Sequence, residues 1–366
     1  MNIAFSSERW DRIRSAHDQW WKDELERPLI AIRLEGYPAD RAEPSLPAHG
    51  FASFYDSSVP AEAIVDRWDY ELSTCRFLGD AFPHIWANFG PGVMAAFIGC
   101  DLKATESTSW FAPSAVTEIA DIHFRFDPDA IWFKRIAEIM RAAVHRWQGQ
   151  VQVGMTDLGG NLDILSSFRP GEKLLLDLYD APDEVERLTW EAHETWWAYY
   201  EALNKTLQPV NPGYTAWTPI FSGDPYYMLQ CDFCYMIGPD MFDRFVKPEL
   251  AASCRRLRNS FYHLDGPGQL PHLDSLLTIP QLKGVQWIPG AGQPDEAHWP
   301  DVYRRIRDAG KKIQLFGRES SENYRVLDAL AAQLGSAHQT VLLAEADRSE
   351  EDAVRRFLAR HGCDAE

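Results

Sequence analysis

Two glycine-rich segments of this chain place polar residues directly after a short apolar stretch. His263 and Asp265 stand in FYHLDGPG (261–268), and Gln286 and Trp287 stand in GVQWIPGAG (284–292). Side chains two residues apart on an extended strand share a face, so the histidine and the carboxylate are predicted to point the same way. Such a pair can exchange a proton with a substrate or help to bind a metal ion. The spacing therefore predicts a functional site at the end of a buried strand.

Polar residues follow other predicted strands in the same manner, and we take these positions together as one candidate site. Asp163 has a structural alternative, because it could pair with Arg169, and Glu319 follows the predicted strand 312–316. The candidate catalytic residues are Asp157, Asp232, His263 and Asp265, with His263 a metal ligand only if a metal is present. The candidate substrate-binding residues are Asn88, Asn161, Trp217, Gln286 and Trp287.

The elements that must position these residues alternate between strand and helix. An N-terminal helix (7–24), a strand (28–33) and an aperiodic excursion rich in Pro, Ala, Ser and Gly (35–60) open the chain. The predicted elements after them are helix 61–78, a strand and glycine turn over 82–92, helix 93–98, a hairpin or extended arm over 108–122, helix 129–147, strand 151–155, helix 183–205, strand 214–221, helix 239–258, strand 260–264, helix 270–277, strand 284–288, helix 298–309, strand 312–316, helix 321–334, strand 340–343 and helix 350–361.

About eight such units without a linker-like break favour one (β/α)8 barrel, also called a TIM barrel, spanning 1–366, with the additions of 1–80 packed on it. Barrels of this kind carry their sites at the carboxyl ends of the strands. A doubly wound sheet is the alternative. It usually shows a G-x-G-x-x-G turn after its first strand, and nothing after Arg33 matches that motif.

Composition narrows the classes of function. The formal net charge of −18 argues against nucleic acid as a partner, because no basic surface is available to neutralise phosphates. No apolar run reaches the roughly 20 residues of a membrane helix, and the polar segment 1–14 does not resemble a signal peptide. We therefore expect a cytoplasmic protein that acts on a small molecule.

Cysteines and tryptophans allow two readings each. Six scattered cysteines do not form a disulfide framework, and the single C-x-x-C at 231–234 indicates zinc only weakly, so packing is the favoured role. The tryptophan pairs 20–21 and 196–197 have helical spacing typical of core or interface residues. The tryptophan-rich helix around 190–200 is compatible with a homodimer. Trp86, Trp217 and Trp287 lie near strand ends and are candidates for a ligand wall.

Five motifs resemble those of the uroporphyrinogen decarboxylase superfamily, and more closely its trimethylamine-corrinoid-protein-like branch. They are NFGPG (88–92), MTDLGGNLDIL (155–165), MIGPDMFDRFVKPEL (236–250), YHLDGPG (262–268) and GVQWIPGAG (284–292). The resemblance covers about 80–345 and implies a uroporphyrinogen-decarboxylase-like (β/α)8 barrel. It also implies a methyltransferase-like activity that involves a corrinoid protein or a small methyl donor.

The chain departs from both chemistries that the resemblance implies. The related methyltransferases activate a thiol on zinc through a His-x-Cys motif and a later cysteine, whereas this chain has His263-Leu264-Asp265 and no cysteine in 316–324. The decarboxylases use an arginine-rich N-terminal segment that is not recognisable around 27–33. The cofactor thus stays open, with zinc or a partner-bound corrinoid as candidates. The alternative functions are a hydrolase or lyase acting on a glycoside or another hydroxyl-rich molecule through carboxylates and tryptophans, and a non-catalytic binding protein.

Overall fold

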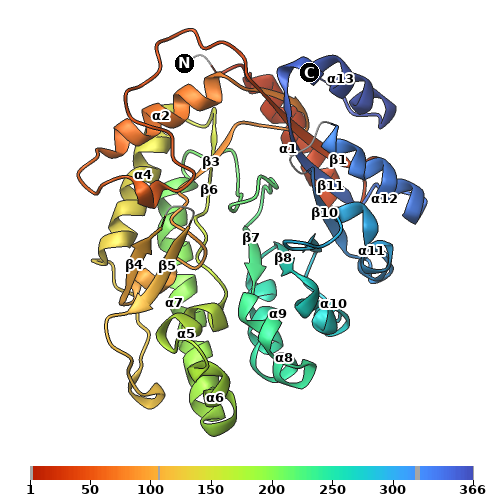
Figure 1. Ribbon diagram of the computed structural model, residues 1–366. Coiled ribbons are helices and arrows are strands. Elements are labelled where there is room, and N and C mark those ends of the chain that lie inside the picture. Colours follow the sequence, from red (N-terminus) through yellow and green to blue (C-terminus); the bar gives the residue numbers. More distant parts are fainter. Residues whose placement is uncertain (1–2, 106–107, 318–321, 366) are drawn as a thin grey trace.

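Eight strands of the chain belong to a (β/α)8 barrel in the computed structural model, which describes residues 3–105, 108–317 and 322–365 (Figure 1). They are β1 (Leu29–Glu35), β3 (His84–Trp86), β6 (Gln152–Gly154), β7 (Tyr226–Gln230), β8 (Asn259–Asp265), β9 (Gly284–Ile288), β10 (Lys312–Gly317) and β11 (Thr340–Asp347). Six of them pair in parallel in the order β1-β11-β10-β9-β8-β7, and β3 pairs in parallel with β6. The predicted fold class is confirmed.

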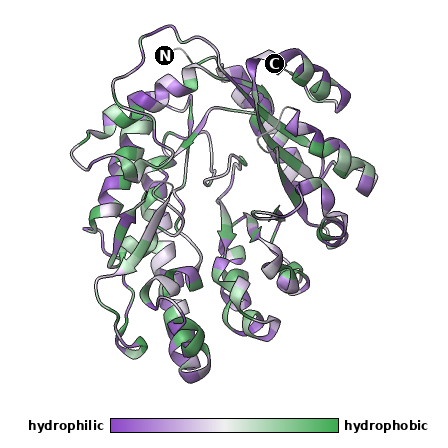
Figure 2. Cartoon of the chain, in the orientation of Figure 1, coloured by the Kyte–Doolittle hydropathy of each residue, from purple (hydrophilic) through white to green (hydrophobic). Residues whose placement is uncertain are grey.

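Helices lie outside the strands and cover them (Figure 1). They are α1 (Ser7–Trp21), α2 (Ala61–Ser73), α3 (Met94–Phe97), α4 (Ile131–Trp147), α5 (Asn161–Phe168), α6 (Lys173–Asp180), α7 (Pro182–Leu207), α8 (Pro239–Phe245), α9 (Lys247–Arg256), α10 (Leu273–Leu277), α11 (Pro300–Asp308), α12 (Val326–Leu334) and α13 (Glu351–Arg360). Most helices carry both hydrophilic and hydrophobic stretches, as expected of helices with one buried face (Figure 2). None of the helices in the described residues has the length and apolar character needed to cross a membrane.

Two predicted elements, helix 61–78 and strand 214–221, differ in the structure. The predicted helix 61–78 ends at Ser73, and its remainder forms β2 (Arg76–Gly79), which pairs antiparallel with β1. β2 thus occupies the edge of β1 on which β3 would pair in a fully hydrogen-bonded barrel. In the described residues no ladder joins β1 to β3 or β6 to β7, so the eight barrel strands fall into two sheets: six of them in a sheet that β2 extends, and β3 with β6 in the other.

The predicted strand 214–221 is wrong, because the only pairing there is an isolated bridge between Tyr214 and Ser222. The barrel strand is β7, which follows Pro225 in a stretch where the sequence predicts a loop. Its five residues, YYMLQ, are all buried. A run buried on both faces lacks the alternation of a half-exposed strand. The segment 214–222 instead lies beside β6, where the N–H of Met155 donates to the carbonyl of Thr215 over 3.0 Å.

The tryptophan pairs lie in the core, as their helical spacing indicated. Trp20, Trp196 and Trp197 are each no more than 4% exposed, and the Trp196 ring stacks on Tyr200 and meets Tyr227 of β7 edge-on. Since Trp196 and Trp197 pack within their own chain, they supply no surface for a second copy. The homodimer stays a prediction without their support.

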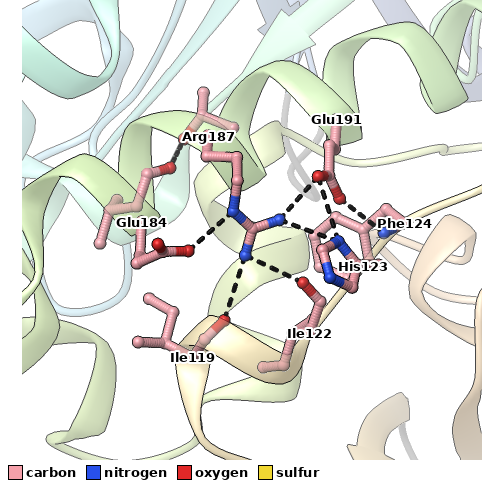
Figure 3. Close-up of polar contacts among 9 residues, drawn as sticks. Ile119, Ile122, His123, Phe124, Glu184, Arg187 and Glu191 are labelled. Carbon is pink, nitrogen blue, oxygen red and sulfur yellow. Dashed lines mark hydrogen bonds and ion pairs between the residues drawn. The ribbon is translucent and has the colours of Figure 1, made fainter.

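A cluster around Arg187 of α7 fastens the segment that leads from the outer hairpin into α4 (Figure 3). The hairpin consists of β4 (Cys100–Ala104) and β5 (Ser109–Pro113), earlier in the chain than the predicted 108–122. The Arg187 guanidinium donates to the carbonyls of Ile119 and Ile122 at 3.3 and 3.0 Å and to Glu191 at 2.6 Å. One side chain therefore satisfies two backbone acceptors in and next to the short 3-10 helix η2 (Ile119–Asp121).

Replacement Arg187→Ala is expected to lower the free energy of unfolding by about 1–3 kcal/mol, because two part-buried backbone acceptors and Glu191 lose a charged donor. Arg244→Ala is the matched control. Its guanidinium also bonds a glutamate, Glu186, but its side chain is 48% exposed, so a loss below about 1 kcal/mol is expected. Denaturant unfolding measures both. Equal losses in the two variants would contradict a fastening role for Arg187.

Candidate functional site

His263, Asp265 and Asp232 form the centre of the candidate site. His263 and Asp265 lie at the end of β8 on one face, as predicted, with 3.9 Å between Nε2 and the nearer carboxylate oxygen. Asp232 opens the 3-10 turn η3 (Asp232–Met236) that follows the neighbouring strand β7. The three residues offer one nitrogen and two oxygen atoms that all lie within 4.8 Å of one another. Adjacent parallel strands thus bring together residues thirty positions apart.

The imidazole of His263 is held on its other side by Gln286. The two residues are register partners on β8 and β9, and Nδ1 of the histidine forms a short hydrogen bond with Oε1 of the glutamine. Trp217 meets the same ring edge-on, with 5.3 Å between ring centroids. Burial lowers the pKa of His263, against the opposing effects of the Gln286 bond and the Asp265 charge. Burial therefore favours the neutral ring, and the contacts with Gln286 and Trp217 fix its orientation.

Asp163 holds Asp232 in place, a role that the sequence did not predict among the catalytic or substrate-binding residues. Its carboxylate accepts hydrogen bonds from the backbone N–H groups of Asp232 and Phe233 at 3.1 and 2.7 Å. The suggested pairing of Asp163 with Arg169 is wrong, because Arg169 forms its ion pair with Asp177. The bonds of Asp163 join α5 to η3, far away in sequence, so no local pattern could have revealed them.

Asp157 lies behind this group in a tightly packed loop. Its carboxylate accepts from the N–H of Gly159 at 2.9 Å, and the hydroxyl of Tyr227 fixes the same loop through Leu158 and Thr156. Gly159 has φ +84° and touches Gly92 so closely that an added Cβ would lie 2.5 Å from its Cα. The loop therefore requires glycine at this position, and Asp157 is buried as a result.

The acids at this site have perturbed proton affinities. Burial raises the pKa of Asp157 to about 7 and that of Asp163 to about 7, and the charge of Asp232 adds to both shifts. The pKa of Asp232 rises to about 6, first from the surrounding protein and then from Asp265, although its side chain stands at the exposed rim. Groups that titrate near neutral pH can give or take protons during a reaction.

A cavity of about 940 Å³ is lined in part by Trp217, the residue that also contacts the His263 ring. It lies between β1, β10 and β11 on one side and β3 on the other. Its walls combine aromatic and charged side chains, among them Arg33, Trp86, Trp217, Phe316, Asn323 and Glu345. Arg33 forms ion pairs with Glu35 and Glu345, each at 2.6 Å. The volume suits a ligand larger than a few atoms.

Three of the predicted substrate-binding residues lie elsewhere or are otherwise engaged. Trp287 is 1% exposed and packs on Trp299, because consecutive strand residues point to opposite faces and Gln286 takes the inner one. Asn88 bonds the backbone of Gly50 and Gly90 and so stabilises a turn. Asn161 is buried as the first residue of α5, with an amide oxygen that has no partner among the described residues.

A divalent cation is compatible with the central residues, whereas the zinc-thiolate site implied by the family resemblance is not. Cys231 and Cys234 are buried, burial raises the pKa of the Cys231 thiol, and neither belongs to the metal-compatible group. One imidazole and two carboxylates are ordinary ligands of Zn²⁺ or Mn²⁺. Bond lengths near 2.1 Å place ligand atoms roughly 3.3 Å apart, so each would shift by about an ångström. Glu319 lies outside the described residues.

No family model and no curated protein sequence matches this chain. Among solved structures, the chain is similar to a methyltransferase from Methanosarcina mazei, with a TM-score of 0.58 over 91% of this chain and 92% of that one. The sequences are 11% identical, so the likeness shows the fold alone. A macrophomate synthase structure aligns over 63% of this chain and 70% of that one at 14% identity, with a TM-score of only 0.22.

Proposed function

We propose that this chain is a methyltransferase-like enzyme that moves a methyl group between a donor and a small molecule. The carrying observation is the convergence of Asp232, His263 and Asp265 at adjacent strand ends. The fold, similar to that of a methyltransferase over nearly the whole chain, supports the class. The donor is a small methylated molecule or a corrinoid held by a partner protein. The cavity next to Trp217 receives the body of the small molecule.

The residues divide the chemistry between them. When an acceptor X–H gains a methyl group, the donor–carbon bond breaks, an X–C bond forms and the proton of X–H must leave. Asp232, with its pKa near 6, is placed to take that proton, while His263 and Asp265 orient the acceptor. If a divalent cation is held by the same three residues, Asp232 serves as a ligand and not as the base; the cation would then lower the pKa of the acceptor as a Lewis acid, and the proton would leave to solvent.

Metal binding tests the central part of this proposal. Titration calorimetry of the purified protein with Zn²⁺ or Mn²⁺ is expected to give one site per chain. Asp232→Asn and Asp265→Asn should each weaken it at least tenfold, because a carboxylate ligand is replaced by a neutral amide. Asp183→Asn, an acid of α7 whose side chain is 97% exposed, is the control and should leave the affinity unchanged. Unaltered binding in the first two variants would contradict the site.

Activity is tested with methylcobalamin as donor and a panel of thiols, amines and phenols as acceptors. The absorbance of methylcobalamin is expected to decrease only when both protein and acceptor are present. The rate of this decrease should be at least a hundredfold lower in Asp232→Asn. A second candidate function is cleavage of a glycoside, favoured by Trp86 and Trp217 on the cavity wall. Release of nitrophenol from aryl glycosides, without methyl transfer, would select that alternative.

A further inference from the structure

Four strands of the barrel carry a row of polar residues at one level, three of them buried and His263 half-buried. Gln230, His263, Gln286 and Gln314 are consecutive register partners on β7, β8, β9 and β10, so all four face the same side of the sheet. The three glutamines are at most 5% exposed. Glutamine is uncommon in such positions, because a buried amide costs free energy unless its hydrogen bonds are satisfied. The row therefore needs a reason beyond packing.

Only some of the amide atoms along the row have a hydrogen-bond partner. Oε1 of Gln286 meets Nδ1 of His263, whereas its Nε2 has no partner among the described residues. Both amide atoms of Gln314 also lack a partner there. Gln286 thus satisfies the histidine and leaves its own amide nitrogen without a bond. Its position is explained by what it does to the imidazole.

An amide oxygen can only accept a hydrogen bond, which determines where the proton of a neutral imidazole lies. With Oε1 of Gln286 at Nδ1, the proton must be on Nδ1, and Nε2 is left with a lone pair. Nε2 lies 3.9 Å from a carboxylate oxygen of Asp265. A lone pair and a carboxylate repel each other unless a positive centre lies between them. This tautomer accordingly prepares Nε2 to bind a cation or to accept a proton.

We propose that Gln286 is a positioning residue that locks His263 in the Nδ1–H tautomer and directs Nε2 toward Asp232 and Asp265. Outer hydrogen-bond partners of this kind orient metal-bound histidines and are commonly backbone carbonyls or carboxylates. Here the amide of Gln286, from the next strand, fills that place. The consequence for metal affinity rests on the function proposed above, whereas the tautomer itself does not.

The tautomer is measured directly by long-range ¹⁵N–¹H NMR of protein labelled at histidine, with the His263 signals assigned by their loss in His263→Asn. Protonated Nδ1 and unprotonated Nε2 are expected in the unaltered protein at pH 8. A proton on Nε2 instead would overturn the proposal. Gln286→Leu should release the lock and give a mixture of tautomers, while Gln286→Glu, which keeps an acceptor oxygen, should restore the original signals.

Calorimetry with Zn²⁺ supplies the second measurement. Gln286→Leu is expected to weaken binding about 10- to 100-fold, and Gln286→Glu to stay within a few-fold of the unaltered protein. Gln314→Leu is the matched control, from the same row and equally buried but without contact to His263. An unaltered protein that shows the Nδ1–H tautomer but binds no metal would remove the metal from the proposed function and leave the positioning role intact. Equal tautomers and affinities in Gln286→Leu would refute the role.

Discussion

His263→Ala is expected to abolish methyl transfer and to weaken metal binding at least about 100-fold, since loss of an outer partner alone costs about 10- to 100-fold. The free energy of unfolding should change by no more than about 1 kcal/mol. The reason is that the half-buried ring contacts Gln286, Asp265 and the edge of Trp217, and is not packed among several apolar side chains. Calorimetry, the methylcobalamin assay and denaturant unfolding check the three effects.

His17 of α1 provides the opposite case as a control. It is 2% exposed, its Nδ1 meets the carbonyl of Ile13, and its ring packs against Phe82 and Phe221. His17→Ala should therefore lower the free energy of unfolding by about 2–4 kcal/mol while the metal affinity of the folded protein stays the same. A large stability loss in His263→Ala with unchanged binding would identify residue 263 as structural instead.

Asp157→Asn is expected to change how stability depends on pH. The folded protein raises the pKa of Asp157 from 3.8 to about 7, so between these values the folded state holds a proton that the unfolded state has released. Stability from this group is therefore fully present below about pH 4, falls as pH rises, and levels off above about pH 7. A shift of this size corresponds to about 4 kcal/mol over the whole pH range.

In Asp157→Asn the stability should not decrease with rising pH in this way, since an amide does not titrate. We subtract the free energy of unfolding of the unaltered protein from that of the variant at each pH. This difference is expected to be about 2–4 kcal/mol higher, in favour of the variant, at pH 8 than at pH 4. Denaturant unfolding at the two values measures the difference. Asp183→Asn, at an exposed position, should show no such difference. A parallel pH profile for Asp157→Asn and the unaltered protein would show that the buried carboxyl does not titrate in this range.

The order of strands and helices was predictable wherever local pattern and burial agreed. β8 to β11 and the helices after them follow apolar runs with clear limits, and they lie within a few residues of the predicted ranges. β7 was missed because a fully buried run of five residues gives no alternation. β2 was missed because its pairing with β1 depends on the fold and not on any property of 76–79 itself.

Parts of the site followed from strand geometry alone. The common face of His263 and Asp265 needs only the two-residue period of a strand, and the structure bears it out. The same period could have excluded Trp287, because Gln286 and Trp287 are neighbours on β9 and must face opposite sides. Asp163 was beyond reach, since its bonds to the backbone of η3 arise only when α5 and η3 meet.

The two sheets of the barrel meet along a seam at which β2 keeps β1 from pairing with β3. The large cavity lies at that boundary, with Arg33 and Glu345 from the sheet of β1 and β11 on one side and Trp86 of β3 on the other. If the two sheets moved slightly apart there, only side-chain packing would be lost, because no strand ladder in the described residues joins them. A substrate bound in the cavity would contact both sheets at once. Its binding affinity would therefore be coupled to the distance between the two sheets at the barrel mouth.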